Sequence, residues 1–70
     1  MLSIKVRSTA IRQVDYDAGS QALTVRFLKG GLAVYEGVPR AVFDAMIKAP
    51  SVGRYYRQVI QARYGRRSQT

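Results

Sequence analysis

The four acidic side chains, Asp15, Asp17, Glu36 and Asp44, are the residues that could support acid–base chemistry. Hydrolysis and group transfer usually need two titratable groups held close together. Only Asp15 and Asp17 share a strand face, and a strand end with a turn-initiating Asp explains that pair better than a cation site does. The absence of Cys and His excludes thiolate and imidazole mechanisms and Cys/His zinc sites. We therefore expect no enzymatic activity, no metal and no cofactor.

Arginine is the more informative residue type. Twelve Lys and Arg stand against four Asp and Glu, which gives a net charge of +8, and nine of the twelve are Arg. From Arg54 onward there are five Arg and no acid. A face that is charged only for solubility normally mixes both signs. The excess therefore indicates a polyanionic partner, with nucleic acid as the first candidate and an anionic membrane surface as the second.

Tyrosine can complement arginine on such a surface, because aromatic rings stack on unpaired bases while Arg forks bind phosphates. Most of the five tyrosines nevertheless fall on apolar stripes and are expected in the core. The predicted nucleic-acid contacts are five arginines for phosphate and one tyrosine for stacking: Arg54, Arg57, Arg63, Arg66, Arg67 and Tyr35.

The first half of the chain must supply the sheet that positions these side chains. Apolar and polar residues alternate with a period of two, as in half-buried strands, over residues 11–16 and 23–27. A third predicted strand, residues 32–36, is apolar at its first four positions. In that last segment we favour Ala33 and Tyr35 on the buried face. Residues 3–7 add a short edge strand in the alternative, four-stranded version of the sheet.

Turn residues separate these strands. The run Asp17-Ala18-Gly19-Ser20 predicts a hairpin turn, with an Asp able to accept from the backbone two residues on and Gly19 at positive φ. Residues 29–31, Lys-Gly-Gly, predict the next turn.

The second half changes to helical spacing. Pro39 at a first helical position opens a helix that Pro50 ends. Ser51 is a natural N-cap for a second helix with an apolar stripe at i, i+3, i+4, i+7 and i+8. Gly65 is a candidate C-cap, and residues 65–70 are expected to be a flexible tail. The predicted core comprises Val14, Leu23, Val25, Phe27, Tyr35, Phe43, Met46, Ile47, Tyr55, Val59 and Ile60.

These patterns predict one α+β domain over residues 1–70, with a three- or four-stranded antiparallel meander followed by two C-terminal helices packed on one face. Seventy residues are too few for two domains. Lys5 and Arg7 interrupt any signal peptide, and no apolar run reaches the ~18 residues of a membrane span. We therefore expect a cytoplasmic protein with no membrane partner.

The order of several residues resembles the KTSC domain, a family named from the C-terminus of some lysyl-tRNA synthetases and also found as small bacterial and phage proteins. The resemblance covers residues 8–64, and the Val-Pro pair and the Ser-x-Gly-x-Tyr-Tyr element are its most specific parts. The residues that carry it are Ser8, Ile11, Val14, Tyr16, Asp17, Leu23, Val25, Phe27, Gly30, Tyr35, Val38, Pro39, Phe43, Ala49, Ser51, Gly53, Tyr55, Tyr56, Ile60 and Tyr64.

The chain departs from the family pattern at two positions. Ala33 stands where the family has the first Tyr of a Tyr-x-Tyr element, and Tyr35 matches the second. Arg57 replaces an Asn that commonly follows the aromatic pair, which adds positive charge. The association with synthetases implies RNA binding. The sequence therefore predicts a non-enzymatic RNA-binding module, and the alternative is a protein-interaction module that uses its basic face or an edge strand for an acidic partner.

Overall fold

The computed structural model describes residues 1–64 and the backbone of residues 66–69. Its sheet is antiparallel, and the strands lie in the same order as in the chain. The strands are β1 (Leu2–Lys5), β2 (Ile11–Asp17), β3 (Ala22–Phe27), β4 (Leu32–Tyr35) and β5 (Arg66–Gln69). The predicted meander is confirmed, including the N-terminal edge strand.

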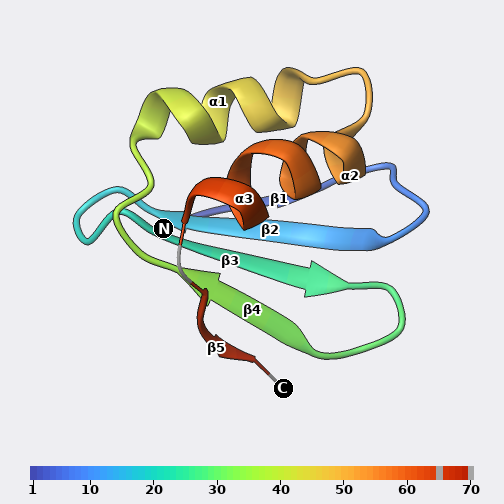
Figure 1. The fold of residues 1–70 in the computed structure, drawn as a ribbon, viewed down its shortest axis with the longest axis horizontal. Helices are drawn as coiled ribbons and strands as arrows, with labels where there is room; N and C mark the ends of the chain where they lie inside the picture. Colours follow the sequence, from blue (N-terminus) through green and yellow to red (C-terminus); the bar gives the residue numbers. More distant parts are fainter. Residues whose placement is uncertain (65, 70) are drawn as a thin grey trace.

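Two helical segments follow β4, and both lie on the same side of the sheet (Figure 1). The first is α1 (Arg40–Lys48). The second is continuous and comprises α2 (Val52–Tyr55), a π-helical turn η1 (Tyr56–Ile60) and α3 (Gln61–Arg63). The Ser51 hydroxyl caps it by accepting from the Arg54 N–H at 3.3 Å, as predicted. No helix in the described part of the chain has the length and apolar character needed to span a bilayer.

The C-terminal residues differ from expectation. Residues 66–69 form β5, where Val34 lies opposite Ser68 and Ala33 opposite Gln69, so the prediction of a flexible tail is wrong for this segment. Pairing gives the backbone groups along the edge of β4 their partners. The polar sequence of β5 lacks the alternation that marks a strand. Gly65, the expected C-cap, and Thr70 lie outside the described residues.

The turn between β2 and β3 has the predicted Asp17 hydrogen bond but not the predicted position of positive φ. Asp17 Oδ1 accepts from the Gly19 N–H at 3.1 Å, as expected. The positive φ in this turn lies at Gln21, at 56°, and not at Gly19. At the β3–β4 turn, Gly30 and Gly31 both have positive φ, at 97° and 83°, a conformation that side chains with a Cβ rarely adopt.

The core lies between the helices and one face of the sheet. Of the predicted core residues, Phe27, Ile47, Tyr55 and Val59 are partly buried and pack against it, and the rest are buried. Tyr16 joins strand to helix, because its ring stacks on Phe43 with centroids 4.8 Å apart and its hydroxyl donates to the Val38 carbonyl at 2.6 Å. The buried hydrophobic residues absent from the predicted core list are Ile11, Tyr16, Ala33, Val38, Val52 and Tyr56.

Candidate nucleic-acid interface

A groove of about 380 Å³ lies where the loop between β1 and β2 meets the start of the second helical segment. Three arginines line it: Arg7 from the loop, and Arg54 and Arg57 from the helix. The other lining residues are Ser8, Thr9, Ala10, Phe27, Pro50, Ser51, Val52, Gly53 and Tyr56. We call this the basic groove, since none of the described residues that line it carries a carboxylate.

Local hydrogen bonds fix the loop side of the basic groove. The Ser8 hydroxyl oxygen accepts from the N–H groups of Ala10 at 3.1 Å and Ile11 at 3.2 Å. A Cβ on Gly53 would lie only 3.3 Å from this oxygen. Glycine therefore permits the close approach of helix and loop that brings Arg7 near the helical arginines.

The arginines of the basic groove are available to a ligand. Within the described residues, ion pairs join Arg26 to Asp15 at 2.7 Å and Arg40 to Asp44 at 3.0 Å. None involves Arg7, Arg54 or Arg57. Because Arg54 and Arg57 are one turn apart on the helix, their side chains project from neighbouring positions. The groove can therefore present several guanidinium groups to phosphates without first breaking an internal ion pair.

Phe27 and Tyr56 give the basic groove an aromatic component. Their rings meet edge to face, with centroids 5.7 Å apart. Tyr56 is buried, and its hydroxyl oxygen lies 2.6 Å from that of Tyr35, whereas Phe27 is only partly buried. Phe27 is therefore the aromatic residue that the structure places within reach of a groove ligand.

The structure separates the residues predicted to bind nucleic acid. Arg54 and Arg57 lie together, as expected. Arg63 is exposed but ends α3, at the far end of the helical segment, and does not line the groove. Arg66 and Arg67 belong to β5, of which the structure describes the backbone only.

Tyr35 does not fit its predicted role. Its side chain is 1% exposed, so its ring faces are covered by protein and cannot stack on a base. The prediction of Tyr35 as the stacking residue is wrong, whereas the expected inward orientation of Ala33 and Tyr35 is confirmed. Sequence reasoning also missed Arg7, because no local pattern shows that this loop residue meets a helix that follows more than forty positions later.

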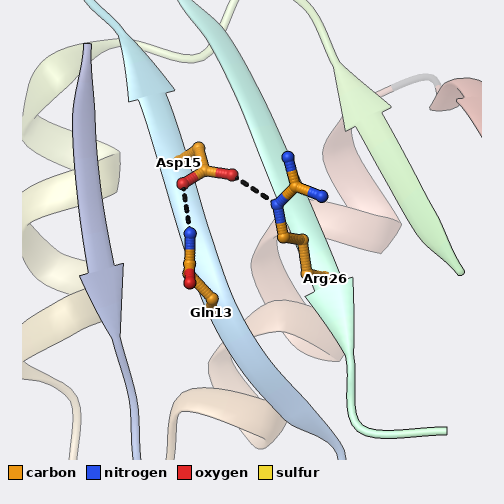
Figure 2. Close-up of polar contacts among 3 residues, drawn as sticks. All are labelled: Gln13, Asp15 and Arg26. Carbon is orange, nitrogen blue, oxygen red and sulfur yellow. Dashed lines mark hydrogen bonds and ion pairs between the residues drawn. The ribbon is translucent and has the colours of Figure 1, made fainter. Parts of the chain in front are cut away.

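A second polar cluster lies on the face of the sheet that the helices leave open (Figure 2). Asp15 is 4% exposed on this face. Its carboxylate accepts from Gln13 Nε2 at 2.8 Å and from Arg26 Nε at 2.7 Å. No group of three acidic residues in the described part of the chain is placed to hold a metal ion.

Two opposing effects set the pKa of Asp15. Desolvation is the largest single effect and raises the pKa. Hydrogen bonds from Gln13, Ser3 and Arg26, together with the charge of Arg26, outweigh it and hold the pKa below its ordinary value of 3.8. Asp15 is therefore ionised at neutral pH, and its two carboxylate oxygens accept hydrogen bonds from Gln13 and Arg26.

Comparison with known proteins identifies the family. The family model of the KTSC domain matches residues 7–64. The chain belongs to the KTSC domain family. The crystal structure of a KTSC domain protein from Yersinia pestis superposes with a TM-score of 0.89 at 28% identity, covering 96% of this chain and 94% of that one. The expected family and the α+β fold are thereby confirmed.

Relatives of this KTSC domain occur both alone and within a larger enzyme. An uncharacterized protein of Stutzerimonas stutzeri is 36% identical over 66 residues, which cover 94% of this chain and 93% of that protein. A lysine–tRNA ligase of Nostoc punctiforme is 30% identical over 61 residues. That match covers 87% of this chain but 11% of the ligase, so the similarity is confined to a small part of the enzyme.

Proposed function

We propose that this KTSC domain is a non-enzymatic module that binds RNA through the basic groove. The observation that carries the proposal is the convergence of Arg7, Arg54 and Arg57 on one groove, with no carboxylate partner among the described residues. Phosphate contacts from guanidinium groups provide most of the affinity of such surfaces. The similarity to part of a lysine–tRNA ligase supports RNA as the polyanion, and a cytoplasmic location accords with that ligand.

The partly buried ring of Phe27 in the basic groove favours single-stranded over duplex RNA. Phe27 can contact a base only if that base is unpaired and turned toward the protein. The hydroxyl groups of Ser8 and Thr9 lie beside the arginines and can donate to phosphate oxygens. We therefore propose that a few nucleotides lie along the groove, with phosphates on the arginines and one base against Phe27.

A salt titration tests this proposal. Affinity for a single-stranded RNA should fall with salt at a log–log slope of about −2 if three arginines contact phosphate, since each contact contributes about −0.7. The double variant Arg54→Gln/Arg57→Gln should bind more weakly and flatten the slope by about one to two units. Duplex RNA and duplex DNA, titrated in parallel, distinguish single strands from duplexes.

Arg63→Gln provides the matched control. It removes the same charge as Arg54→Gln from the same helical segment but lies outside the basic groove. Equal losses of affinity for Arg63→Gln and Arg54→Gln would show that binding follows net charge and not the groove. Absence of binding at 50 mM salt would contradict RNA binding altogether.

A second function, docking of an extended protein partner, is supported by the edge of the sheet. Strand β1 is an edge strand, and Leu2 on it is 37% exposed. An extended segment can pair with such an edge through backbone hydrogen bonds. This function predicts saturable binding of one acidic protein partner, loss of that binding in Leu2→Glu, and no binding of unrelated RNA.

A further inference from the structure

The open face of the sheet carries a hollow of about 530 Å³, which shares Phe27 with the basic groove but is lined by none of Arg7, Arg54 and Arg57. Asp15 and Arg26 both line it, and so does Arg12. The complete set of lining residues is Met1, Ser3, Arg12, Gln13, Asp15, Arg26, Phe27, Gly30, Gly31 and Leu32. We call this the open-face hollow.

Asp15 holds Arg26 through one atom only. The contact is from Arg26 Nε to Asp15 Oδ2, at 2.7 Å. A guanidinium has five N–H donors, so four remain on the two terminal nitrogens. Figure 2 shows these nitrogens without a contact to the residues drawn, and no other described residue accepts a hydrogen bond from them. The Arg26 side chain is 48% exposed, so solvent and ligands can reach it.

Asp15 is itself fixed in place. Gln13 Nε2 donates to its other oxygen at 2.8 Å, and Ser3 lies directly opposite Asp15 on β1. A buried carboxylate held in this way restricts the orientation of Arg26. Arg26 has therefore already lost side-chain conformational entropy in the free protein, and ligand binding costs less entropy than it would for a mobile arginine.

Charge favours an anion in this hollow. Arg12 and Arg26 bring two positive charges, and Asp15 is the one acid among the described lining residues. Arg12 is exposed and lies beside the irregularity in pairing between β2 and β3. The planar fork of a guanidinium matches two oxygens of a phosphate, and a second arginine suits a doubly charged group.

We propose that the open-face hollow is a binding site for a phosphate group, held by the terminal nitrogens of Arg26 and by Arg12. The role of Asp15 is to position Arg26. The inference goes beyond RNA binding in the basic groove and does not depend on it. The competing explanation is that Asp15 and Arg26 form only a cross-strand ion pair that stabilises the sheet.

The variant Asp15→Asn separates these explanations. It removes a negative charge, so long-range attraction alone predicts tighter phosphate binding. Positioning predicts the opposite, a weakening of about two- to tenfold, because Arg26 loses its fixed orientation. Asp44→Asn is the matched control, since it removes the same charge from a 41% exposed side chain of α1 that does not line the hollow.

The experiment is a titration with inorganic phosphate at constant ionic strength, followed by the NMR signals of the arginine Nε–H groups. We expect a saturable shift of the Arg26 signal in the wild type. Binding should be weaker in Asp15→Asn and in Arg26→Lys, which keeps the charge but lacks the fork, and unchanged or tighter in Asp44→Asn. A wild type without a saturable shift, or tighter binding by Asp15→Asn, would overturn the proposal.

Asp15→Asn could unfold the sheet, so Arg12→Gln serves as a second variant. Arg12 is exposed and makes no ion pair with a described residue. Folded Arg12→Gln protein that binds phosphate as tightly as the wild type would contradict the proposed two-arginine site.

A parallel titration with single-stranded RNA identifies the source of the phosphate. If Arg12→Gln and Arg26→Lys also weaken RNA binding, the hollow receives a backbone phosphate. If they weaken only inorganic phosphate binding, the site takes a small phosphorylated molecule. Either result supports the phosphate site. Loss of RNA binding in Arg54→Gln/Arg57→Gln tests the basic groove only and does not bear on the open-face hollow.

Discussion

The hydroxyl oxygens of Tyr35 and Tyr56 lie 2.6 Å apart in the core. Their rings also meet edge to face, with centroids 5.9 Å apart. Tyr35 belongs to β4, and Tyr56 begins the π-helical turn η1. The pair therefore fixes the second helical segment against the sheet at the point where the helical hydrogen bonding changes.

We expect this hydroxyl pair to show energetic coupling. Tyr56→Phe should lower the free energy of unfolding by about 1–3 kcal/mol, because the remaining buried hydroxyl loses a partner. The double variant Tyr35→Phe/Tyr56→Phe should cost less than the sum of the two single changes. Urea denaturation of the four proteins measures the coupling, and strict additivity would contradict it.

Asp15 should make the fold sensitive to acid. Its pKa is lowered in the folded protein, so its contribution to stability is complete above the unfolded pKa and is lost as pH falls through the folded pKa. The melting temperature of the wild type should therefore drop more steeply below pH 4 than that of Asp15→Asn.

At pH 7, Asp15→Asn should be less stable than the wild type by about 1–3 kcal/mol, since the charged hydrogen bonds are weakened. Asp44→Asn should retain the steep acid dependence. Identical pH profiles for the wild type and Asp15→Asn would show that Asp15 contributes nothing to it.

Phe43 should be the more sensitive of the two phenylalanines. Its side chain is 1% exposed and stacks on Tyr16 with an interplanar angle of 13°. Phe43→Ala should cost about 3–5 kcal/mol, a large share of the stability of so small a domain. Phe27→Ala removes a partly buried ring and should cost less. Thermal melts monitored by circular dichroism rank the two.

Gly53→Ala should disturb the basic groove. The added Cβ would lie 3.3 Å from Ser8 Oγ, which two backbone N–H groups hold in place. Helix and loop must therefore separate by a few tenths of an ångström. We expect weaker RNA binding, and the double variant Gly53→Ala/Ser8→Gly should relieve the contact. If Gly53→Ala binds RNA normally, the close approach is not needed for the groove.

The strands β1 to β4 and the two helical segments could be predicted because their signals are local, whereas β5 carries no such signal. Alternation in residues 23–27 and the Ser51 cap each lie within a few positions, and both are confirmed. The site required information that the sequence does not display. Arg7 and Arg54 meet only after the sheet and helices have packed.

Two features depend on how the sheet packs and pairs. The sequence predicts both an inward position and a stacking role for Tyr35, and burial in the core excludes the second. The sequence does not show that Asp15 pairs with Arg26 on the adjacent strand. Cross-strand partners depend on register, which a single segment does not determine.

The order of strands in the sheet has a consequence for the sequence of events in folding. Pairings β1–β2, β2–β3 and β3–β4 each close a short turn, but β4 and β5 are joined through residues 36–65, which include both helical segments. Closing a long connection costs more chain entropy and is slower than closing a hairpin. We therefore expect the meander to assemble early and β5 to join last, so that the amides of β5 are the last in the sheet to gain protection when refolding is followed by pulsed hydrogen exchange.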